Sequence, residues 1–190
     1  NQPFVGRHTP RIRAGAGLRQ LDLGVTAGRS YNGYVWLKPE KGMAAEVTLT
    51  WGDDQGARES TPVVLMPGDY RQFSFAFTAV NTSDKAWAEL AVSQGTVLVG
   101  TASLMPADNV EGMRADTLEL LKELNSPIYR WPGGNFVSGY DWRDGIGERD
   151  KRPPRPNLAW DSLESNDFGI DEFMTLCRLL DTEPYIAVNS

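Results

Sequence analysis

The sequence predicts two domains of different class, an antiparallel β-sandwich or jelly roll over residues 1–105 and part of a parallel α/β fold over residues 106–190. Before Pro106, short β-branched and aromatic segments follow one another with no helical pattern between them. After Pro106 the apolar residues recur at helical spacing. A Pro-Gly-Gly turn at residues 132–134 then stops a strand and opens a long polar loop, where parallel α/β folds place ligand groups.

Five segments of the first domain are predicted to be strands because they are rich in β-branched and aromatic residues, and several alternate with period two. Gly, Pro, Asn and Asp residues suited to turns separate them. This alternation places most tryptophans and phenylalanines of the domain in its core, although one or two of them can form a platform for a sugar. The segments are residues 34–37, 46–51, 70–77, 86–92 and 96–100.

The second domain alternates helices and strands, which is typical of a parallel sheet with buried strands. A capping box at residues 116–119 and leucines at helical spacing predict a first helix that ends at Asn125. The elements expected after it are a strand at 127–131, a loop at 132–168, a helix at 169–181 and a strand at 184–189.

This second domain is too short for a closed barrel. About 85 residues follow Pro106, whereas a (β/α)8 barrel needs about 200 or more. Two parallel strands with open edges cannot bury their faces. We therefore expect a fragment of a larger enzyme, with an α/β part that is unstable alone and with residues 189–190 against more protein. The first residue, Asn1, is consistent with a processed or truncated start.

Composition argues against several classes of partner. With 19 Lys and Arg against 25 Asp and Glu, the net charge is -6, which disfavours nucleic acid and anionic membranes. No apolar run approaches the roughly 20 residues that span a bilayer. One cysteine and one histidine leave no basis for a disulfide, a metal site or a cofactor. Cys177 is interpreted as a small buried hydrophobe of the second helix.

Two residues near the Pro-Gly-Gly turn are candidates for ligand binding. The guanidinium of Arg130, at the end of a strand, can donate to a carboxylate or to sugar hydroxyls, or it can form a structural ion pair. Asn135 follows two glycines that let a ligand approach the backbone, and its amide suits a vicinal diol. An Asx-turn is the alternative for Asn135.

Aromatic and charged residues fill the rest of the loop. Tyr140, Trp142 and Trp160 stand in a polar stretch, where their rings suggest packing on the C–H face of a sugar. Anchoring of the loop by these hydrophobic side chains is the alternative, and for Trp142 we favour it. The charges of residues 141–144 and 148–152 alternate in sign, which we interpret as ion pairing rather than catalysis.

The loop also carries a family resemblance. The sequence RWPGGNFVSGYDWRDGIG at residues 130–147, followed by RDKRP at 149–153, LAW at 158–160 and ESNDFG at 164–169, closely resembles the α-L-arabinofuranosidases of glycoside hydrolase family 51. The resemblance runs from about residue 114 to 189. It implies a retaining enzyme that removes terminal arabinofuranosyl units from arabinoxylan or arabinan in hemicellulose degradation.

The family resemblance also implies an architecture. Residues 106–190 would cover strand 2 to strand 3 of a (β/α)8 TIM barrel. Residues 1–105 are similar, less closely, to the carbohydrate-binding-module-like sandwich that some members insert. Carried over by position, Arg130 and Asn135 would hold the arabinofuranose, and Trp160 would pack against the sugar on the leaving-group side.

The catalytic residues of the family have no counterpart in this chain. Retaining hydrolysis needs two carboxylates about 5 Å apart, and in this family both are glutamates of later barrel strands, expected beyond Ser190. We interpret Glu164 as a brace of the loop or helix start and Glu172 as a residue of the helix surface. Glu148 replaces a proline of many members, a departure that we do not expect to affect the chemistry.

We therefore expect part of a retaining α-L-arabinofuranosidase that supplies substrate-binding residues but neither catalytic glutamate, and that is inactive alone. The alternatives are a non-catalytic carbohydrate-binding module with a barrel remnant and a purely structural subunit. The expected partners are an arabinose-containing polysaccharide or oligosaccharide and the remainder of the barrel, which a second polypeptide can supply. We expect no nucleic acid, membrane, cofactor or metal, and a homo-oligomer when complete. The sequence does not decide the compartment, and secretion is slightly favoured.

Overall fold

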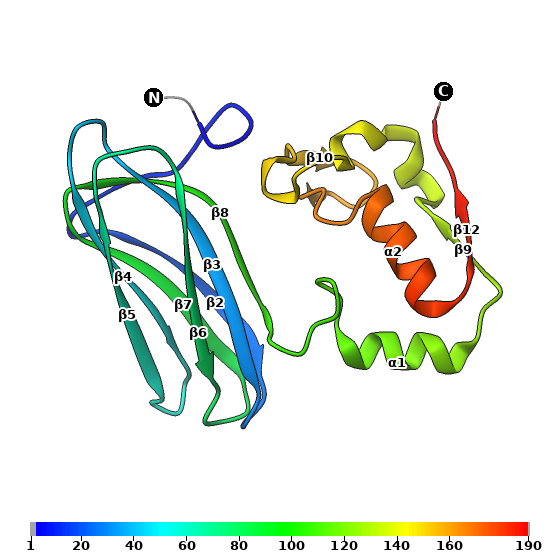
Figure 1. Ribbon diagram of the computed structural model, residues 1–190, viewed down its shortest axis with the longest axis horizontal. Helices are drawn as coiled ribbons and strands as arrows, with labels where there is room; N and C mark the ends of the chain where they lie inside the picture. Colours follow the sequence, from blue (N-terminus) through cyan, green and yellow to red (C-terminus); the bar gives the residue numbers. More distant parts are fainter. Residues whose placement is uncertain (1–2, 190) are drawn as a thin grey trace. The chain divides into compact units, whose positions relative to one another are not determined.

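The computed structural model describes residues 3–189, and the chain divides between Asp108 and Asn109 into two compact units (Figure 1). Among the described residues, no helix has both the length and the apolar character needed to cross a membrane.

The first unit consists of two four-stranded antiparallel sheets, with strand orders β1-β8-β3-β6 and β2-β7-β4-β5. This is the strand order of a jelly roll, so the predicted all-β sandwich is confirmed. The strands are β1 (Arg11–Arg13), β2 (Gly17–Val25), β3 (Ser30–Pro39), β4 (Ala45–Gly52), β5 (Arg58–Leu65), β6 (Arg71–Thr78), β7 (Ser83–Gln94) and β8 (Thr96–Pro106).

All five predicted segments lie in or overlap strands β3, β4, β6, β7 and β8, whereas β1, β2 and β5 were not predicted. Strand β2 is exposed along almost its whole length, and β5 begins with polar residues. Both lie at an edge of their sheet, and neither therefore shows an apolar alternation. In β5, Pro62 stands opposite Thr48 of β4.

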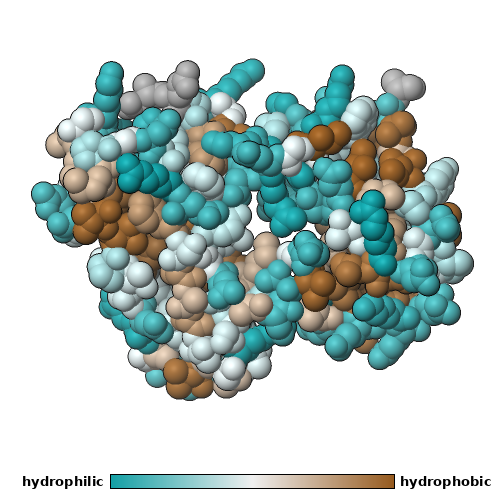
Figure 2. Space-filling model, viewed as in Figure 1, coloured by the Kyte–Doolittle hydropathy of each residue, from teal (hydrophilic) through white to brown (hydrophobic). Residues whose placement is uncertain are grey.

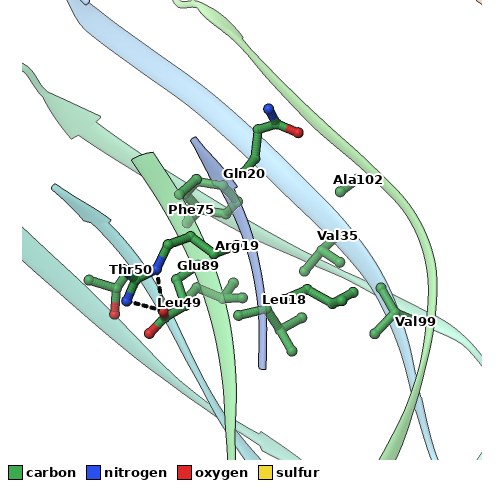
Figure 3. Close-up of a pocket in the computed structure, with 12 residues that line it drawn as sticks. Leu18, Arg19, Gln20, Val35, Leu49, Thr50, Phe75, Glu89, Val99 and Ala102 are labelled. Atoms are coloured by element: carbon green, nitrogen blue, oxygen red, sulfur yellow. Dashed lines mark hydrogen bonds and ion pairs between the residues drawn. The ribbon is translucent and has the colours of Figure 1, made fainter. Parts of the chain in front are cut away.

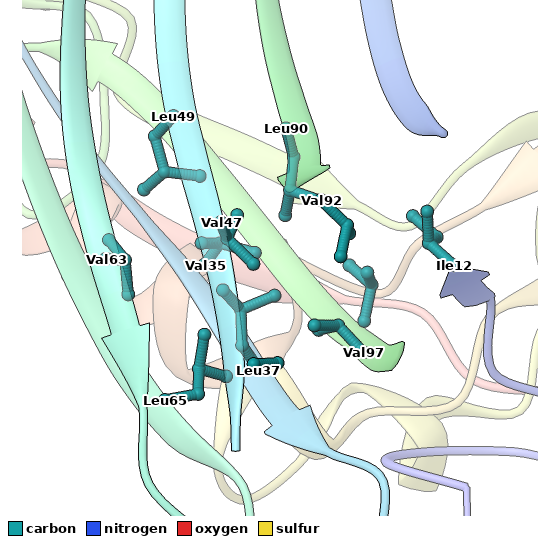
Figure 4. Close-up of a cluster of buried hydrophobic side chains, with 12 residues drawn as sticks. Ile12, Val35, Leu37, Val47, Leu49, Val63, Leu65, Leu90, Val92 and Val97 are labelled. Carbon is teal, nitrogen blue, oxygen red and sulfur yellow. The ribbon is translucent and has the colours of Figure 1, made fainter. Parts of the chain in front are cut away.

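Alternate residues of the facing strands form the core of the sandwich (Figure 4). In β3, Val35 and Leu37 point inward and are 3% and 0% exposed. They pack with Val47 and Leu49 from the opposite sheet. A second cluster contains the ring of Trp51, which stacks on that of Phe77 at 4.1 Å between centroids. Aromatic burial predicted from alternation is thus confirmed for Trp51 and Phe77.

Two other tryptophans lie half-buried on the outer faces of the sheets. The ring of Trp36 packs against Phe4, with 5.3 Å between centroids. The guanidinium carbon of Arg19 lies 4.5 Å from the ring centroid of Trp87. Both rings are therefore partly covered by side chains of the same unit.

A cavity of about 250 Å³ remains between the two sheets beside β2 (Figure 3). Its walls are mostly apolar side chains such as Leu49 and Leu90, and the ion pair between Arg19 and Glu89 links β2 to β7 beside it. Strand β2 shifts register around Asp22, a residue with φ of 55°. The lining therefore combines core side chains of both sheets with exposed residues of the edge strand β2.

The second unit has the predicted order of helix, strand, long loop, helix and strand. Strands β9 and β12 form a two-stranded parallel sheet, with Ile128 opposite Glu183 and Trp131 opposite Ile186. A parallel sheet of two strands is no closed barrel, so the barrel itself stays a prediction. The elements are α1 (Ala115–Leu124), β9 (Ile128–Trp131), short 3₁₀ helices η1 (Gly134–Gly139), η2 (Trp142–Gly145) and η3 (Arg149–Lys151), the hairpin β10 (Arg155–Asn157) and β11 (Ser162–Glu164), α2 (Ile170–Leu180), and β12 (Glu183–Ile186).

Two expectations for this unit are wrong. Helix α1 begins at Ala115 after Arg114 with no side-chain cap, so Asp116 lies inside the first turn and not at the predicted N-cap position. Its carboxylate accepts the backbone N–H of Thr117 at 2.8 Å and pairs with the guanidinium of Arg114 at 2.6 Å. The strands are not buried either, since Ile128 is 52% and Tyr185 56% exposed. No further strand or helix covers these faces among residues 3–189, and hydrophobic side chains reach the surface of this unit in Figure 2.

Replacing Leu37 by alanine should destabilise the sandwich by about 2–5 kcal/mol, because a fully buried side chain leaves a cavity that the core cannot refill. Leu21→Ala in strand β2 is the matched control, since Leu21 is 53% exposed, and we expect a loss below about 1 kcal/mol. Denaturant unfolding followed by circular dichroism measures both. Equal losses in the two variants would contradict the assignment of the core.

Candidate functional site

Arg130 ends strand β9 with an exposed side chain that folds back over the turn. A Cβ placed on Gly133 would lie 3.1 Å from a terminal nitrogen of Arg130, so the guanidinium rests against the backbone there. Between residues 3 and 189 it makes no ion pair and no hydrogen bond. The structural ion pair that we considered for Arg130 is thus not formed, and its donors remain open to a ligand.

Asn135 follows directly in the turn after β9. The Trp131–Pro132 peptide bond is cis, and Gly134 has φ of 62°, a left-handed conformation that suits glycine. These residues start the 3₁₀ helix η1, on which Asn135 is exposed. Its side-chain amide has no hydrogen-bond partner among the described residues, so the alternative of an Asx-turn is not realised.

An aromatic cluster holds this turn against helix α2. The ring of Trp131 packs edge-on against Tyr140 at 5.4 Å and stacks on Phe173 at 5.9 Å. Tyr140 is only 6% exposed, and its burial, with a smaller effect of the Glu164 charge, raises its pKa to about 12. Of the two interpretations of Tyr140, loop anchoring is the one that the structure shows, because the loop builds a small core of its own.

Trp160, the other aromatic candidate, lies in the turn between β10 and β11. Its side chain is 72% exposed. The turn is fixed by Asn157, whose side-chain oxygen accepts the backbone N–H of Ala159 at 3.1 Å and that of Trp160 at 3.2 Å. The ring of Trp160 is thus presented to solvent from a fixed backbone, whereas Trp142 is half-buried in η2.

The buried guanidinium of Arg152 organises the rest of the loop. Its side chain is 2% exposed and donates to both carboxylate oxygens of Glu172, at 2.7 and 3.0 Å. It also donates to the carbonyl oxygen of Gly147, at 2.9 and 3.2 Å, and to that of Asn166 at 3.0 Å. All five N–H groups of the guanidinium are therefore bonded, as a buried charge requires.

Glu172 is the anionic half of this pair, so its interpretation as a residue of the helix surface is wrong. Its carboxylate also accepts the N–H of Gly169 at 2.8 Å and so caps helix α2. Burial alone would raise the pKa of Glu172, but the hydrogen bonds from Arg152 and from the Gly169 N–H lower it. Glu164 acts as the predicted brace, because it accepts the backbone N–H of Asn166 at 3.0 Å.

The predicted ion pairing of the charged segments is confirmed. Arg143 binds Asp141 through two side-chain contacts of 2.8 and 3.0 Å, and Arg155 binds Asp144 at 2.7 and 2.9 Å. The hydrogen bond from the Arg143 side chain lowers the pKa of Asp141. The second pair joins η2 to strand β10, so it fixes the hairpin against the preceding turn.

These elements enclose an open pocket of about 850 Å³. Asn135 lies on one wall, and Asn157 and Glu164 of the hairpin lie on another, whereas Arg130 and Trp160 do not line it. Sequence patterns did not identify Asn157 or Arg152. A glutamate three residues after Gly169 was a detectable sign of the helix cap. The lining residues are Asn135, Phe136, Ser138, Gly139, Tyr140, Asp141, Asp144, Arg155, Pro156, Asn157, Leu158, Ala159 and Glu164.

Comparison with known proteins finds matches for this unit. Residues 120–190 match the family model described as the alpha-L-arabinofuranosidase 1 domain. A probable alpha-L-arabinofuranosidase C of Aspergillus clavatus is 56% identical over 84 residues, which are 44% of this chain and 17% of that protein. An intracellular exo-alpha-(1->5)-L-arabinofuranosidase of Acetivibrio thermocellus is 53% identical over 79 residues, 42% of this chain and 16% of that protein.

One solved structure is also similar in sequence to part of this chain. The alpha-L-arabinofuranosidase from Thermotoga maritima, crystallised as an arabinose complex, is 53% identical over 43% of this chain and 17% of its own, with a TM-score of 0.42. The sequence identities confirm the resemblance to arabinofuranosidases for this part of the chain. The chain spans about one sixth of the length of the relatives that it matches.

Replacing Glu172 by glutamine should destabilise the second unit by about 3 kcal/mol, because it leaves the buried charge of Arg152 uncompensated. Arg143→Gln removes an exposed pair, with the Arg143 side chain 74% exposed, and should cost less than about 1 kcal/mol. Denaturant unfolding followed by tryptophan fluorescence compares the variants. Similar losses for both would show that the Arg152 pair is not the stronger constraint.

The same pair predicts a pH dependence. Since the folded-state pKa of Glu172 lies below its ordinary value of 4.5, the pair stabilises the fold fully above that value, and this stabilisation fades as the pH falls through the folded-state pKa. Glu172→Gln should remove this part of the acid-induced loss of stability.

Proposed function

We propose that this chain, whose residues 120–190 match the arabinofuranosidase domain, is part of a retaining α-L-arabinofuranosidase acting on terminal arabinofuranosyl units of arabinoxylan or arabinan. One observation carries the proposal beyond the family match. Arg130 in the last part of strand β9 and Asn135 in the turn after it are both exposed, and their side chains have no hydrogen-bond partner among the described residues. Polar groups held on a fixed turn without protein partners suit a hydroxylated ligand.

The proposed roles follow from the chemistry of the side chains. The planar guanidinium of Arg130 offers several donors to hydroxyl oxygens of the furanose. The amide of Asn135 both donates and accepts, so it can bind two neighbouring hydroxyls. The exposed ring of Trp160 offers an apolar face to the sugar on the leaving-group side.

We assign neither catalytic carboxylate to this chain. A general acid needs a raised pKa, whereas hydrogen bonds from arginine side chains lower the pKa of both Asp141 and Glu172. Asp144 is paired with Arg155, and Glu164 braces the loop. The catalytic pair would come from the remainder of a barrel, in the same or a second polypeptide, which would also cover the exposed strands β9 and β12.

Arg130→Ala and Asn135→Ala should each weaken binding of methyl α-L-arabinofuranoside to the 190-residue chain by about three- to tenfold, the effect of losing one or two hydrogen bonds. Titrations followed by two-dimensional NMR measure this. Arg178→Ala on the exposed face of helix α2 is the control and should bind as the parent does. Binding unaffected by either substitution, or absent from the parent chain, would reject the assigned subsite.

The 190-residue chain alone should not hydrolyse 4-nitrophenyl α-L-arabinofuranoside, because retaining hydrolysis needs two carboxylates, and Asp141, Asp144 and Glu172 of the described loop and helix are each paired with an arginine. Release of nitrophenol above the buffer rate measures this. Turnover that follows the protein through purification, and that is lost in Asp144→Asn or Glu164→Gln, would place a catalytic carboxylate in this chain after all.

A further inference from the structure

The apolar cavity of the sandwich opens at one side, between the edges of the two sheets (Figure 3). Strand β2 is the edge of its own sheet. In the described chain, strand β8 pairs with β1 only over residues 96–98, so its later part has β3 as its one strand partner. Both β2 and the later part of β8 line the cavity. The core is therefore left without a covering strand at this side.

Leu18 and Ala102 mark the opening. Leu18 of β2 stands opposite Leu90. Ala102 of β8 stands opposite Val35. Opposite residues of paired strands share one face of the sheet, and both Leu90 and Val35 are buried in the core. Leu18 and Ala102 therefore point inward, yet Leu18 is 45% exposed and Ala102 is exposed as well. Solvent thus reaches side chains that a closed sandwich would bury.

The cavity has the size and the walls for a small ring. Its volume of about 250 Å³ exceeds the roughly 150 Å³ of an engineered apolar cavity that binds benzene. Leu49, Leu90 and Val99 form its buried wall, and the ring of Phe75 also lines it. Facing sheets lie about 10 Å apart, so the space between them takes one layer of groups, and a flat ring fits it.

The polar side chains of the lining already have partners. Arg19 donates to the carboxylate of Glu89 at 2.6 Å, and the two form an ion pair. The hydroxyl groups of Thr50 and Ser60 are bonded to each other at 2.9 Å. The side-chain amide of Gln20 donates to a backbone carbonyl oxygen at 2.9 Å. The cavity therefore favours a neutral ligand that needs no hydrogen bonds.

We propose that this cavity binds a small, neutral, apolar ligand with one aromatic ring, which enters between β2 and β8. Binding removes the apolar surface of the ligand and of the cavity wall from water, which supplies the driving force. The site belongs to the first unit, so it is independent of the proposed sugar-binding residues of the second unit.

Two probes of similar size test the proposal on the 190-residue chain. In NMR titrations, toluene should shift the methyl signals of Leu18, Leu49 and Val99 with a dissociation constant of about 0.1–1 mM, well within the limit for a ligand of so few atoms. Benzoate should bind at least about tenfold more weakly, because its carboxylate loses hydration without gaining a partner. Methyl signals that stay unshifted up to the solubility limit of toluene would show a packing gap only and overturn the proposal. Equal binding of benzoate would overturn the assignment to neutral ligands.

Ala102→Leu fills the cavity from its opening and should weaken toluene binding at least about tenfold, because the larger side chain takes the space of the ring. Ala76→Leu is the matched control, since Ala76 is exposed, stands opposite Asn32 and does not line the cavity, and it should bind toluene as the parent chain does. Ala88→Leu is a second filling variant should the first not fold. Circular dichroism checks the fold of each variant. A filling variant that folds and binds toluene with the parent affinity would overturn the proposal.

Discussion

Arg152 brings a full positive charge into the interior of the second unit, and the course of the loop follows from the need to satisfy it. Removing an ion from water costs several kcal/mol, which only complete hydrogen bonding and an opposite charge can offset. Glu172 supplies the charge, and carbonyl groups of Gly147 and Asn166 supply the remaining acceptors. Three segments of loop and the start of helix α2 must therefore meet at one point.

Aromatic packing fixes the other end of the loop. Trp131 belongs to strand β9 and Phe173 to helix α2, so their contact ties the strand to the helix that returns to the same sheet. The residues proposed to bind sugar stand between these two fixed points. The backbone of Asn135 is fixed at the start of η1, whereas its exposed side chain makes no hydrogen bond to the described residues. A ligand that binds the Asn135 amide would therefore restrict this side chain but not the turn that carries it.

Sequence patterns identified the features that depend on neighbouring residues, such as strands, helix faces and turns. The alternation in β3 predicted a half-buried strand, and Phe173 and Cys177 at helical spacing predicted the buried face of α2. The Pro-Gly-Gly sequence alone predicted that strand β9 ends just after Arg130 and that Asn135 lies in the turn that follows. The Arg152–Glu172 pair was not foreseen, because 20 positions separate the partners and neighbouring charges of the same loop look equivalent in the sequence.

The other features that the sequence did not predict also have physical explanations. The edge strand β2 exposes most of its residues, so it carries no apolar period to detect. At helix α1, the sequence matched a capping box that begins at Asp116, but the helix already begins at Ala115, so Asp116 lies within its first turn. Asn157 is polar and lies in a hairpin of short strands, and its importance appears only when the pocket is folded.

Pro62 in the edge strand β5 bears on whether a second molecule can add a strand to this edge of the sheet. An exposed strand edge is a template on which another chain can add a strand, and such addition leads to aggregation. Proline has no N–H to offer, so it interrupts the ladder that an incoming strand would need. The β5 edge of the sandwich is therefore a poor template for a further strand at Pro62.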